Sequence, residues 1–177
     1  MAATRLPAKL MNNVDAFAAV AEEYCAWAEG ESLGEIADAR TARKLLAELI
    51  RHAIELPDPS DELSSDAEPE AISSEDYQRI FRRFGSLPFN YYSECFDPLV
   101  VPGEEPVTSD LADDLADIWG DLESGLSLHR AGHVDAAAFH WKYHFDIHWA
   151  HHATSALYAL QCWFSEHHTE LREPPHK

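Results

Sequence analysis

The chain has 177 residues, of which 46% are apolar, and its 32 acidic and 13 basic side chains give a formal net charge of −19 at pH 7. This length predicts one domain with its own hydrophobic core, and this apolar content excludes a disordered chain. The negative charge argues against binding to nucleic acid backbones or anionic membranes. It suits a basic protein partner or bound cations, although a well-solvated surface would have the same composition.

The cysteines and the apolar segments indicate the compartment. Cys25, Cys95 and Cys162 form no Cys-x-x-Cys pair and are odd in number, which favours small buried apolar groups in a reducing environment. The first residues lack the apolar core of a signal peptide, and no apolar run approaches the roughly 20 residues that cross a bilayer. We therefore expect a cytoplasmic protein.

Apolar residues recur at helical spacing along most of the chain. In the first half, this pattern predicts helices over about 13–29, 32–56 and 74–84. The segment 57–70 is rich in proline, serine and acidic residues and has no basic residue, so it predicts a mobile acidic linker.

Residues 85–107 resist a regular assignment. They include Gly103 and four prolines, which break helices: Pro88, Pro98, Pro102 and Pro106. Their many apolar and aromatic side chains are unusual for a free loop. We therefore expect an irregular connection that lies against the helices, with one short extended piece.

Two further helices are predicted in the second half of the chain. One covers 108–131, with Thr108 or Ser109 as its cap, and the other covers 134–167 as a single rod of roughly 50 Å. No strand pattern competes with these helices. The predicted fold class is all-α, a single domain over residues 1–177 built as an antiparallel bundle of four or five helices.

The predicted helix at 108–131 has an acidic side. Its five aspartates fall within an arc of roughly 100° opposite the leucines: Asp110, Asp113, Asp114, Asp117 and Asp121. An exposed, solvated face is the ordinary interpretation of such a stripe. However, aspartate is a poor helix former and like charges four residues apart repel. A cation, histidines or a basic partner opposite the stripe is therefore the alternative.

The last predicted helix has a histidine side, within the stretch FHWKYHFDIHWAHH at 139–152. Five histidines fall within roughly 120° of one another around the helix axis: His140, His144, His148, His151 and His152. The opposite side carries Lys142 and Asp146, a pair at i and i+4 that suits water. The histidine side is therefore expected to be partly buried.

Histidines four residues apart on a helix can bind a transition metal, and carboxylates from a neighbouring helix can complete the site. The candidate ligands are Asp113, Asp117, Asp121, His144, His148 and His152, and the candidate ions are Zn, Mn, Fe and Ni. The candidate pocket beside them comprises Trp141, Tyr143, Trp149, His140 and His151. Two alternatives stay open: hydrogen-bonded packing histidines, or a partly buried group whose charging near pH ~6.5 changes stability.

The known catalytic motifs give no support for an enzyme. The predicted helices contain neither a Glu-x-x-His nor a His-Glu-x-x-His metal motif, and the chain has no nucleophile elbow. No catalytic residue is therefore predicted.

The acidic helix followed by the histidine helix resembles an uncharacterised family of bacterial all-helical proteins, a numbered domain of unknown function. The family pattern has a Leu-Ala-Asp-Ile element, here centred on Asp117, and a His-Trp-Gly-x-His element, here His148 to His152. Ala150 stands in place of the glycine. The resemblance covers about the last hundred residues. It implies a helical fold, draws attention to Asp117, His148 and His152, and implies no activity.

Two functions are compatible with these patterns. The first is a non-enzymatic acidic protein that binds another, basic protein, as inhibitors, immunity proteins and adaptors do, because opposite charges steer association. The second is a metal-binding protein or metal-dependent hydrolase, in which the aspartate and histidine stripes face each other. Composition and the missing motifs favour the first. A solvated aspartate stripe would support it, whereas two facing stripes would support the second.

Overall fold

The computed structural model describes residues 8–59 and 67–168. Its helices are α1 (Ala8–Glu29), α2 (Glu35–Ile54), α3 (Ser74–Phe84), α4 (Leu111–Arg130), α5 (Val134–His144) and α6 (Ala150–Glu166), with a π-helical turn, η1 (Phe145–Trp149), between the last two. Two strands, β1 (Tyr91–Glu94) and β2 (Val107–Asp110), precede α4. The predicted all-α class is confirmed, with the addition of a small two-stranded sheet.

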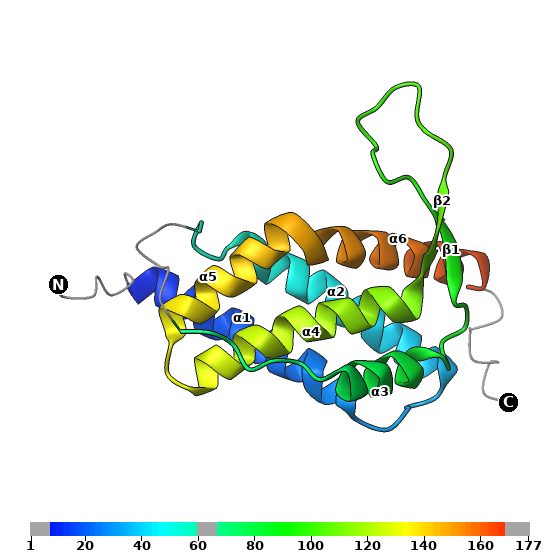
Figure 1. The fold of residues 1–177 in the computed structure, drawn as a ribbon. Helices are drawn as coiled ribbons and strands as arrows, with labels where there is room; N and C mark the ends of the chain where they lie inside the picture. Colours follow the sequence, from blue (N-terminus) through cyan, green and yellow to red (C-terminus); the bar gives the residue numbers. More distant parts are fainter. Residues whose placement is uncertain (1–7, 60–66, 169–177) are drawn as a thin grey trace, which may run out of the picture.

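The long helices lie side by side in an elongated bundle (Figure 1). α1 and α2 form an antiparallel pair, and α4 runs antiparallel to the continuous rod made of α5, η1 and α6. α3 packs at one end, against α1 and α4. With α5, η1 and α6 taken as one rod, the described residues form the predicted five-helix bundle.

Three helices begin at residues other than those predicted. α2 begins at Glu35 and not at about 32. α1 begins at Ala8, so Asn13 lies inside the helix. α4 is capped by Asp110, whose side chain accepts a backbone N–H of the first turn at 2.9 Å. The predicted caps, Thr108 and Ser109, pair in β2 instead.

Aromatic side chains from α1 and from the last helical rod meet in the centre of the core. The ring centroid of Phe17 lies 5.0 Å from that of Trp141 and 6.1 Å from that of Trp149. Tyr24 donates its hydroxyl to the backbone oxygen of Leu115 at 2.8 Å. All these side chains are fully buried. They fix the position of α1 against both α4 and the last rod.

α4 and α5 approach each other closely at Gly125. A Cβ atom on Gly125 would lie 2.0 Å from Nε1 of Trp141, well inside van der Waals contact, so this position requires glycine. The same Nε1 donates to the backbone oxygen of Leu122 at 3.1 Å. The indole ring therefore occupies the space that a side chain on α4 would fill.

The last rod is not the single regular helix predicted for 134–167. It widens at η1, where the N–H of Ala150 donates to the oxygen of Phe145, five residues back. In a regular α-helix each four-residue step rotates a side chain by about 40°, so four histidines at that spacing drift by about 120°. A π-turn rotates less per residue, so η1 counteracts this drift.

The predicted ion pair on the far side of the rod is confirmed, but its surroundings differ. Nζ of Lys142 lies 2.6 Å from Oδ1 of Asp146. Lys142 is nevertheless buried, and its Nζ lies 5.3 Å from the centroid of the Phe145 ring.

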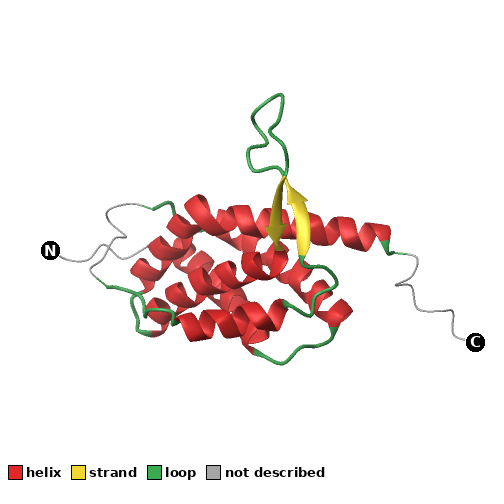
Figure 2. Ribbon diagram, turned by 45° about the vertical axis from the view of Figure 1, so that its right-hand side comes forward, coloured by secondary structure: helices red, strands yellow, loops and turns green. Residues whose placement is uncertain are grey.

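Residues 91–110 form an antiparallel hairpin, in which Tyr91 pairs with Asp110 and Glu94 with Val107. The loop between its strands projects away from the helices (Figure 2), and Leu99 in this loop is 90% exposed. The prediction that residues 85–107 lie against the bundle is therefore wrong for this loop. The strands pair with each other and carry the loop outward.

A buried ion pair between Asp38 of α2 and Arg83 of α3 also involves α1, through a hydrogen bond from Trp27. Asp38 is fully buried, and its carboxylate accepts hydrogen bonds from both terminal nitrogens of Arg83, at 2.8 and 3.1 Å. Trp27 and Ser32 also donate to it, at 2.9 and 2.6 Å. Burial acts to raise the pKa of Asp38, but these hydrogen bonds, first that from Arg83, hold it below its usual value.

Several other predictions concern the segments between helices. The acidic linker predicted at 57–70 falls partly on residues 60–66, which lie outside the described residues. Beyond them, the N–H of Glu70 donates to Oγ of Ser127 on α4 at 3.0 Å.

Cys25 is buried as predicted, whereas Cys95 is exposed. Across 8–59 and 67–168, no helix combines the length and apolar character that crossing a membrane requires.

Candidate metal centre

The acidic side of α4 faces the last helical rod. Asp114 is only 5% exposed, and the side chains of Asp117 and Asp121 are 25% and 13% exposed. The interpretation of this stripe as a solvated face is therefore wrong for these three residues. The aspartate and histidine sides lie opposite each other, one hydrogen bond apart.

Asp113 lies at the edge of this face and is exposed. Its Oδ1 accepts a hydrogen bond from the hydroxyl of Tyr77 at 3.0 Å, and the same hydroxyl donates to Oδ1 of Asp117 at 2.7 Å. Tyr77 belongs to α3, so this helix also holds the acidic side of α4 in place.

A first cluster comprises Asp117, His148 and His152, each of which offers one ligand atom within 4.8 Å of the others. Nε2 of His152 lies 3.7 Å from Oδ2 of Asp117. Its other ring nitrogen, Nδ1, donates to Oδ1 of Asp114 at 2.8 Å. Histidine ligands in metal sites are held in this way, with one nitrogen on a carboxylate and the other left for the ion.

A second cluster comprises Asp121, His140 and His144, again with ligand atoms within 4.8 Å of one another. The rings of His140 and His144 stack with centroids 4.1 Å apart. Nδ1 of His144 donates to Oδ1 of Asp121 at 2.8 Å. Nε2 of His140 is buried and has no hydrogen-bond partner among the described residues.

Asp121 connects the two clusters. While its Oδ1 accepts from His144, its Oδ2 accepts from Nδ1 of His148 at 2.7 Å, and His148 belongs to the first cluster. Burial acts to raise the pKa of Asp121, but the hydrogen bonds from the two histidines hold it below its usual value. The carboxylate is therefore ionised at neutral pH.

The pKa values of His140 and His152 shift in opposite directions. Burial and the neighbouring His144 lower the pKa of His140 to about 4. The hydrogen bond to Asp114, opposed by burial, raises the pKa of His152 above its usual value. Because the two pKa shifts have opposite signs, protonation of these two histidines changes the stability of the fold in opposite directions.

The donor set consists of imidazole nitrogens and carboxylate oxygens, which suit Zn, Mn, Fe and Ni. Neighbouring ligand atoms around a tetrahedral ion lie about 3.3 Å apart. The ligand atoms of each cluster lie within 4.8 Å of one another, so their separations have to close by no more than about 1.5 Å, which rotations of histidine and aspartate side chains can supply.

The other residues of the predicted pocket do not gather in one place. Trp141 and Trp149 are fully buried in the core, and Tyr143 is 43% exposed and stacks on Phe139. Nε2 of His151 lies 2.7 Å from Oε1 of a different carboxylate, Glu94 at the base of the hairpin. Of the five pocket residues, only His140 belongs to a candidate metal cluster.

The residues that orient the candidate ligands were not predicted. Asp114 accepts a hydrogen bond from His152 and another from the hydroxyl of Tyr92, the latter at 2.6 Å. The hydroxyl of Tyr77 donates a hydrogen bond to Asp117. Glu94 accepts hydrogen bonds from Ser109 and Ser155, which join the hairpin to α6. Asp114 had a signal in the sequence, as an aspartate in a helix interior. The tyrosines had none, because they come from segments distant in the sequence.

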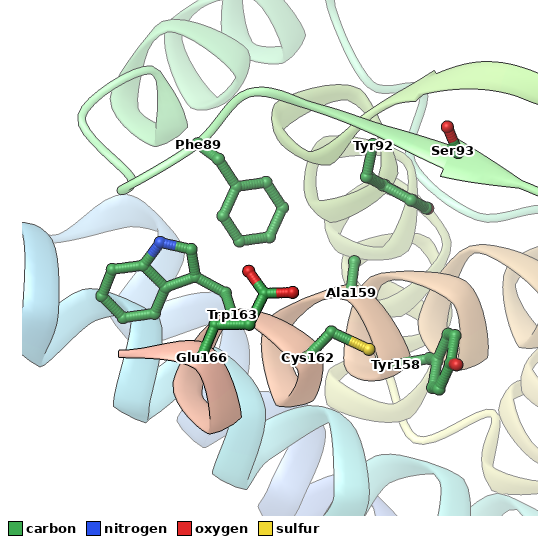
Figure 3. A pocket seen from close by; sticks show the side chains of 8 residues that line it. All are labelled: Phe89, Tyr92, Ser93, Tyr158, Ala159, Cys162, Trp163 and Glu166. Carbon is green, nitrogen blue, oxygen red and sulfur yellow. The ribbon is translucent and has the colours of Figure 1, made fainter. Parts of the chain in front are cut away.

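A hollow of about 240 Å³ lies between the hairpin side and α6 (Figure 3). Phe89 and Tyr92 face Tyr158 and Trp163 across it, and Cys162 and Glu166 supply its polar groups. Through the hydrogen bond of Tyr92 to the carboxylate beside His152, this hollow shares a residue with the support of the first cluster.

Comparison with known proteins agrees with this architecture. A family described as "Domain of unknown function (DUF5063)" matches residues 8–165, which confirms the resemblance to a numbered family. The crystal structure of protein BF1032 from Bacteroides fragilis matches with a TM-score of 0.69 and 22% sequence identity, over 93% of this chain and 96% of that chain. At this identity the likeness extends to the fold alone. No protein with a curated description matches the chain.

Proposed function

The chain belongs to the DUF5063 family, whose description specifies no activity, and we propose that it is a metal-binding protein. The ion is a divalent transition metal, one of Zn, Mn, Fe and Ni, and its ligands are Asp117, His148 and His152. The observation that carries this proposal is the orientation of His152, whose Nδ1 is held by Asp114 while its Nε2 points to Asp117.

Ion pairs between aspartates and charged histidines are the competing explanation of this face. They account for one partner per histidine, as between His152 and Asp114. They do not account for His140, whose Nε2 is buried without a hydrogen bond among the described residues, because an unmade buried hydrogen bond costs about 1–3 kcal/mol. A bound cation would satisfy such a nitrogen and would also reduce the repulsion among the aspartates of α4.

The ion would supply a Lewis acid and would lower the pKa of a bound water to about 7, which is the chemistry that hydrolysis requires. The residues of this chain would position it. Asp114 orients His152, and Tyr77 orients Asp117 through a hydrogen bond of 2.7 Å. The side chain of His148 is 45% exposed, so the first cluster is open to solvent and to a small substrate.

The test is the metal content of untagged protein purified without chelator, measured by mass spectrometry. We expect near-stoichiometric metal in the wild type and its loss in His148→Ala and Asp117→Asn. The matched control is His133→Ala, since His133 is exposed and lies outside both clusters, and it should keep its metal. A wild-type protein that is metal-free and binds none of the four ions on titration would contradict the proposal.

A second function, binding of a protein partner, is supported by the hairpin loop. Leu99 and Val101 are 90% and 88% exposed on a loop that projects from the bundle. The same loop carries Asp97, Glu104 and Glu105 and no basic residue. An apolar tip with acidic neighbours suits a partner with an apolar cleft and a basic rim.

Photo-crosslinking tests this second function. A photoreactive side chain at position 99 should link to a basic protein, whereas the same group at exposed Ile147 on the helical rod should not. Equal crosslinking at both positions, or none at position 99, would count against the loop as a specific binding element.

A further inference from the structure

The row of four histidines opposite α4 is longer than one metal ion requires. His140, His144, His148 and His152 follow one another at four-residue spacing and divide into two clusters, each with its own aspartate. η1 begins directly after the second of them and contains the third, His148. Because the π-turn counteracts the helical drift, both halves of the row face the same helix.

The carboxylate of Asp121 lies between the two halves. Its Oδ1 is 2.8 Å from Nδ1 of His144, and its Oδ2 is 2.7 Å from Nδ1 of His148. Adjacent ligand atoms on an octahedral ion with bonds of about 2.1 Å lie about 3.0 Å apart. An ion that displaced the Nδ1 proton, released to solvent, would therefore find each oxygen of Asp121 already near the distance that two ligands of one ion have.

From this geometry we infer that the face holds two divalent metal ions, one in each cluster, and that Asp121 is the carboxylate that bridges them. The inference rests on the proposed function of the first cluster and extends it to the second. Apart from Asp121, one ion would be held by Asp117, His148 and His152. The other would be held by His140 and His144.

Two further observations support a cation in the second cluster. Nε2 of His140 is buried and lacks a partner among the described residues, so it is available to an ion. The imidazoles of His140 and His144 stack with their centroids 4.1 Å apart, so one ion can reach a nitrogen of each ring. An ion shared by the two imidazoles would use the nitrogen that otherwise stays unpaired.

The experiment is a titration of the metal-free, full-length protein with Mn²⁺, followed by binding stoichiometry and by electron paramagnetic resonance. We expect two ions per chain and a signal broadened by coupling between them. Asp121→Asn should weaken binding of the second ion by about 10- to 100-fold and remove the coupling. Asp110→Asn, a change of the same type at the cap of α4 outside both clusters, should leave two coupled ions, because asparagine caps a helix as well as aspartate does.

The outcomes separate this inference from the proposed function. One ion per chain, lost in His148→Ala and kept in His144→Ala, would overturn the two-metal centre and leave the first site intact. Two ions without coupling would overturn the bridging role of Asp121. No bound ion would overturn both. All variants are compared by circular dichroism with the wild type, whose own stoichiometry decides the question even when a variant is unfolded.

Discussion

Trp141 lies against Gly125 with no room for a single additional carbon atom. A Cβ on Gly125 would come within 2.0 Å of the indole nitrogen, and that nitrogen donates to the backbone of α4 at 3.1 Å. This contact sets the separation of α4 and α5. The same separation brings the carboxylate of Asp121 within 2.8 Å of His144, one helical turn along each helix.

Gly125→Ala is expected to destabilise the protein. The methyl group would displace Trp141 from the core, and overpacking of this kind costs about 1–3 kcal/mol in the free energy of unfolding. Urea denaturation followed by tryptophan fluorescence measures the loss. The variant should also bind metal more weakly, because α5 would move away from α4.

Gly120→Ala is the matched control for this prediction, because the two glycines lie five residues apart in α4. A Cβ on Gly120 would meet no other atom within 4 Å. Alanine is favoured over glycine in a helix by about 1 kcal/mol, so this variant should be as stable as the wild type or more so. Equal destabilisation by both changes would mean that α4 is sensitive to any added methyl group.

Asp114→Asn is expected to lower metal affinity about 10- to 100-fold, because the residue orients His152 without belonging to a cluster. Isothermal titration of Zn²⁺ into the metal-free protein measures the change. Asn preserves the volume of the side chain and an oxygen that can accept from Tyr92. Asp110→Asn removes the same charge one helical turn away, keeps a capping side chain and should change affinity little. If both variants lose affinity equally, the effect is one of charge and not of orientation.

Metal removal is expected to destabilise the folded protein by mass action. An ion that binds only the folded state adds about 2.7 kcal/mol to the free energy of unfolding when its concentration is about 100 times the Kd. Thermal unfolding with added Mn²⁺ and then with excess chelator measures this contribution. The shift should be smaller in His148→Ala, which loses a ligand of the first cluster. A wild type that binds ions but shows no shift would indicate equal binding to the unfolded chain.

Asp38→Asn is expected to destabilise the protein at pH 7 by about 3–5 kcal/mol, because it leaves the buried Arg83 without its counter-ion. The pKa of Asp38 is lowered in the folded state. Its ionisation therefore contributes stability that is fully present above the unfolded-state pKa of about 3.9 and is lost as the pH falls through the folded-state value. This site is distant in the sequence from both metal clusters, so metal content should not change.

The pH dependence provides the check on this assignment. Urea denaturation at pH 7, 4 and 2.5 should show a gap between wild type and Asp38→Asn that narrows below pH 4. A constant gap across this range would mean that the loss comes from packing and not from the charge of the carboxylate.

Much of the candidate site follows from helical periodicity. Histidines four residues apart share a helix side, and the aspartates of α4 share another, so both stripes could be predicted from spacing alone. Their pairing could not, because it depends on which helices become neighbours. The close approach at Gly125 decides that, and a glycine inside a predicted helix has no pattern that marks it as a contact point.

The hairpin and η1 could not be predicted for different reasons. Residues 91–94 and 107–110 are too short to show an alternating pattern, and their pairing spans a loop rich in proline. η1 has no sequence signature in the stretch FDIHW, since its residues are ordinary for a helix. Its presence changes the side on which every later residue lies, so the predicted single helix could place His140 and His144 correctly relative to each other but not relative to His152.

A π-helical turn equals an α-helix that has gained one residue. Removal of one residue at Ile147, which is 62% exposed and belongs to neither cluster, would return the rod to an uninterrupted α-helix. The π-turn absorbs the extra residue, so this deletion would leave α5 and α6 in their present orientation. The same undeleted sequence wound as an α-helix throughout would instead turn α6 by about 100° relative to α5. A single inserted codon thus separates this arrangement from an ordinary helix, and the π-turn keeps the two histidine pairs on one side of the rod.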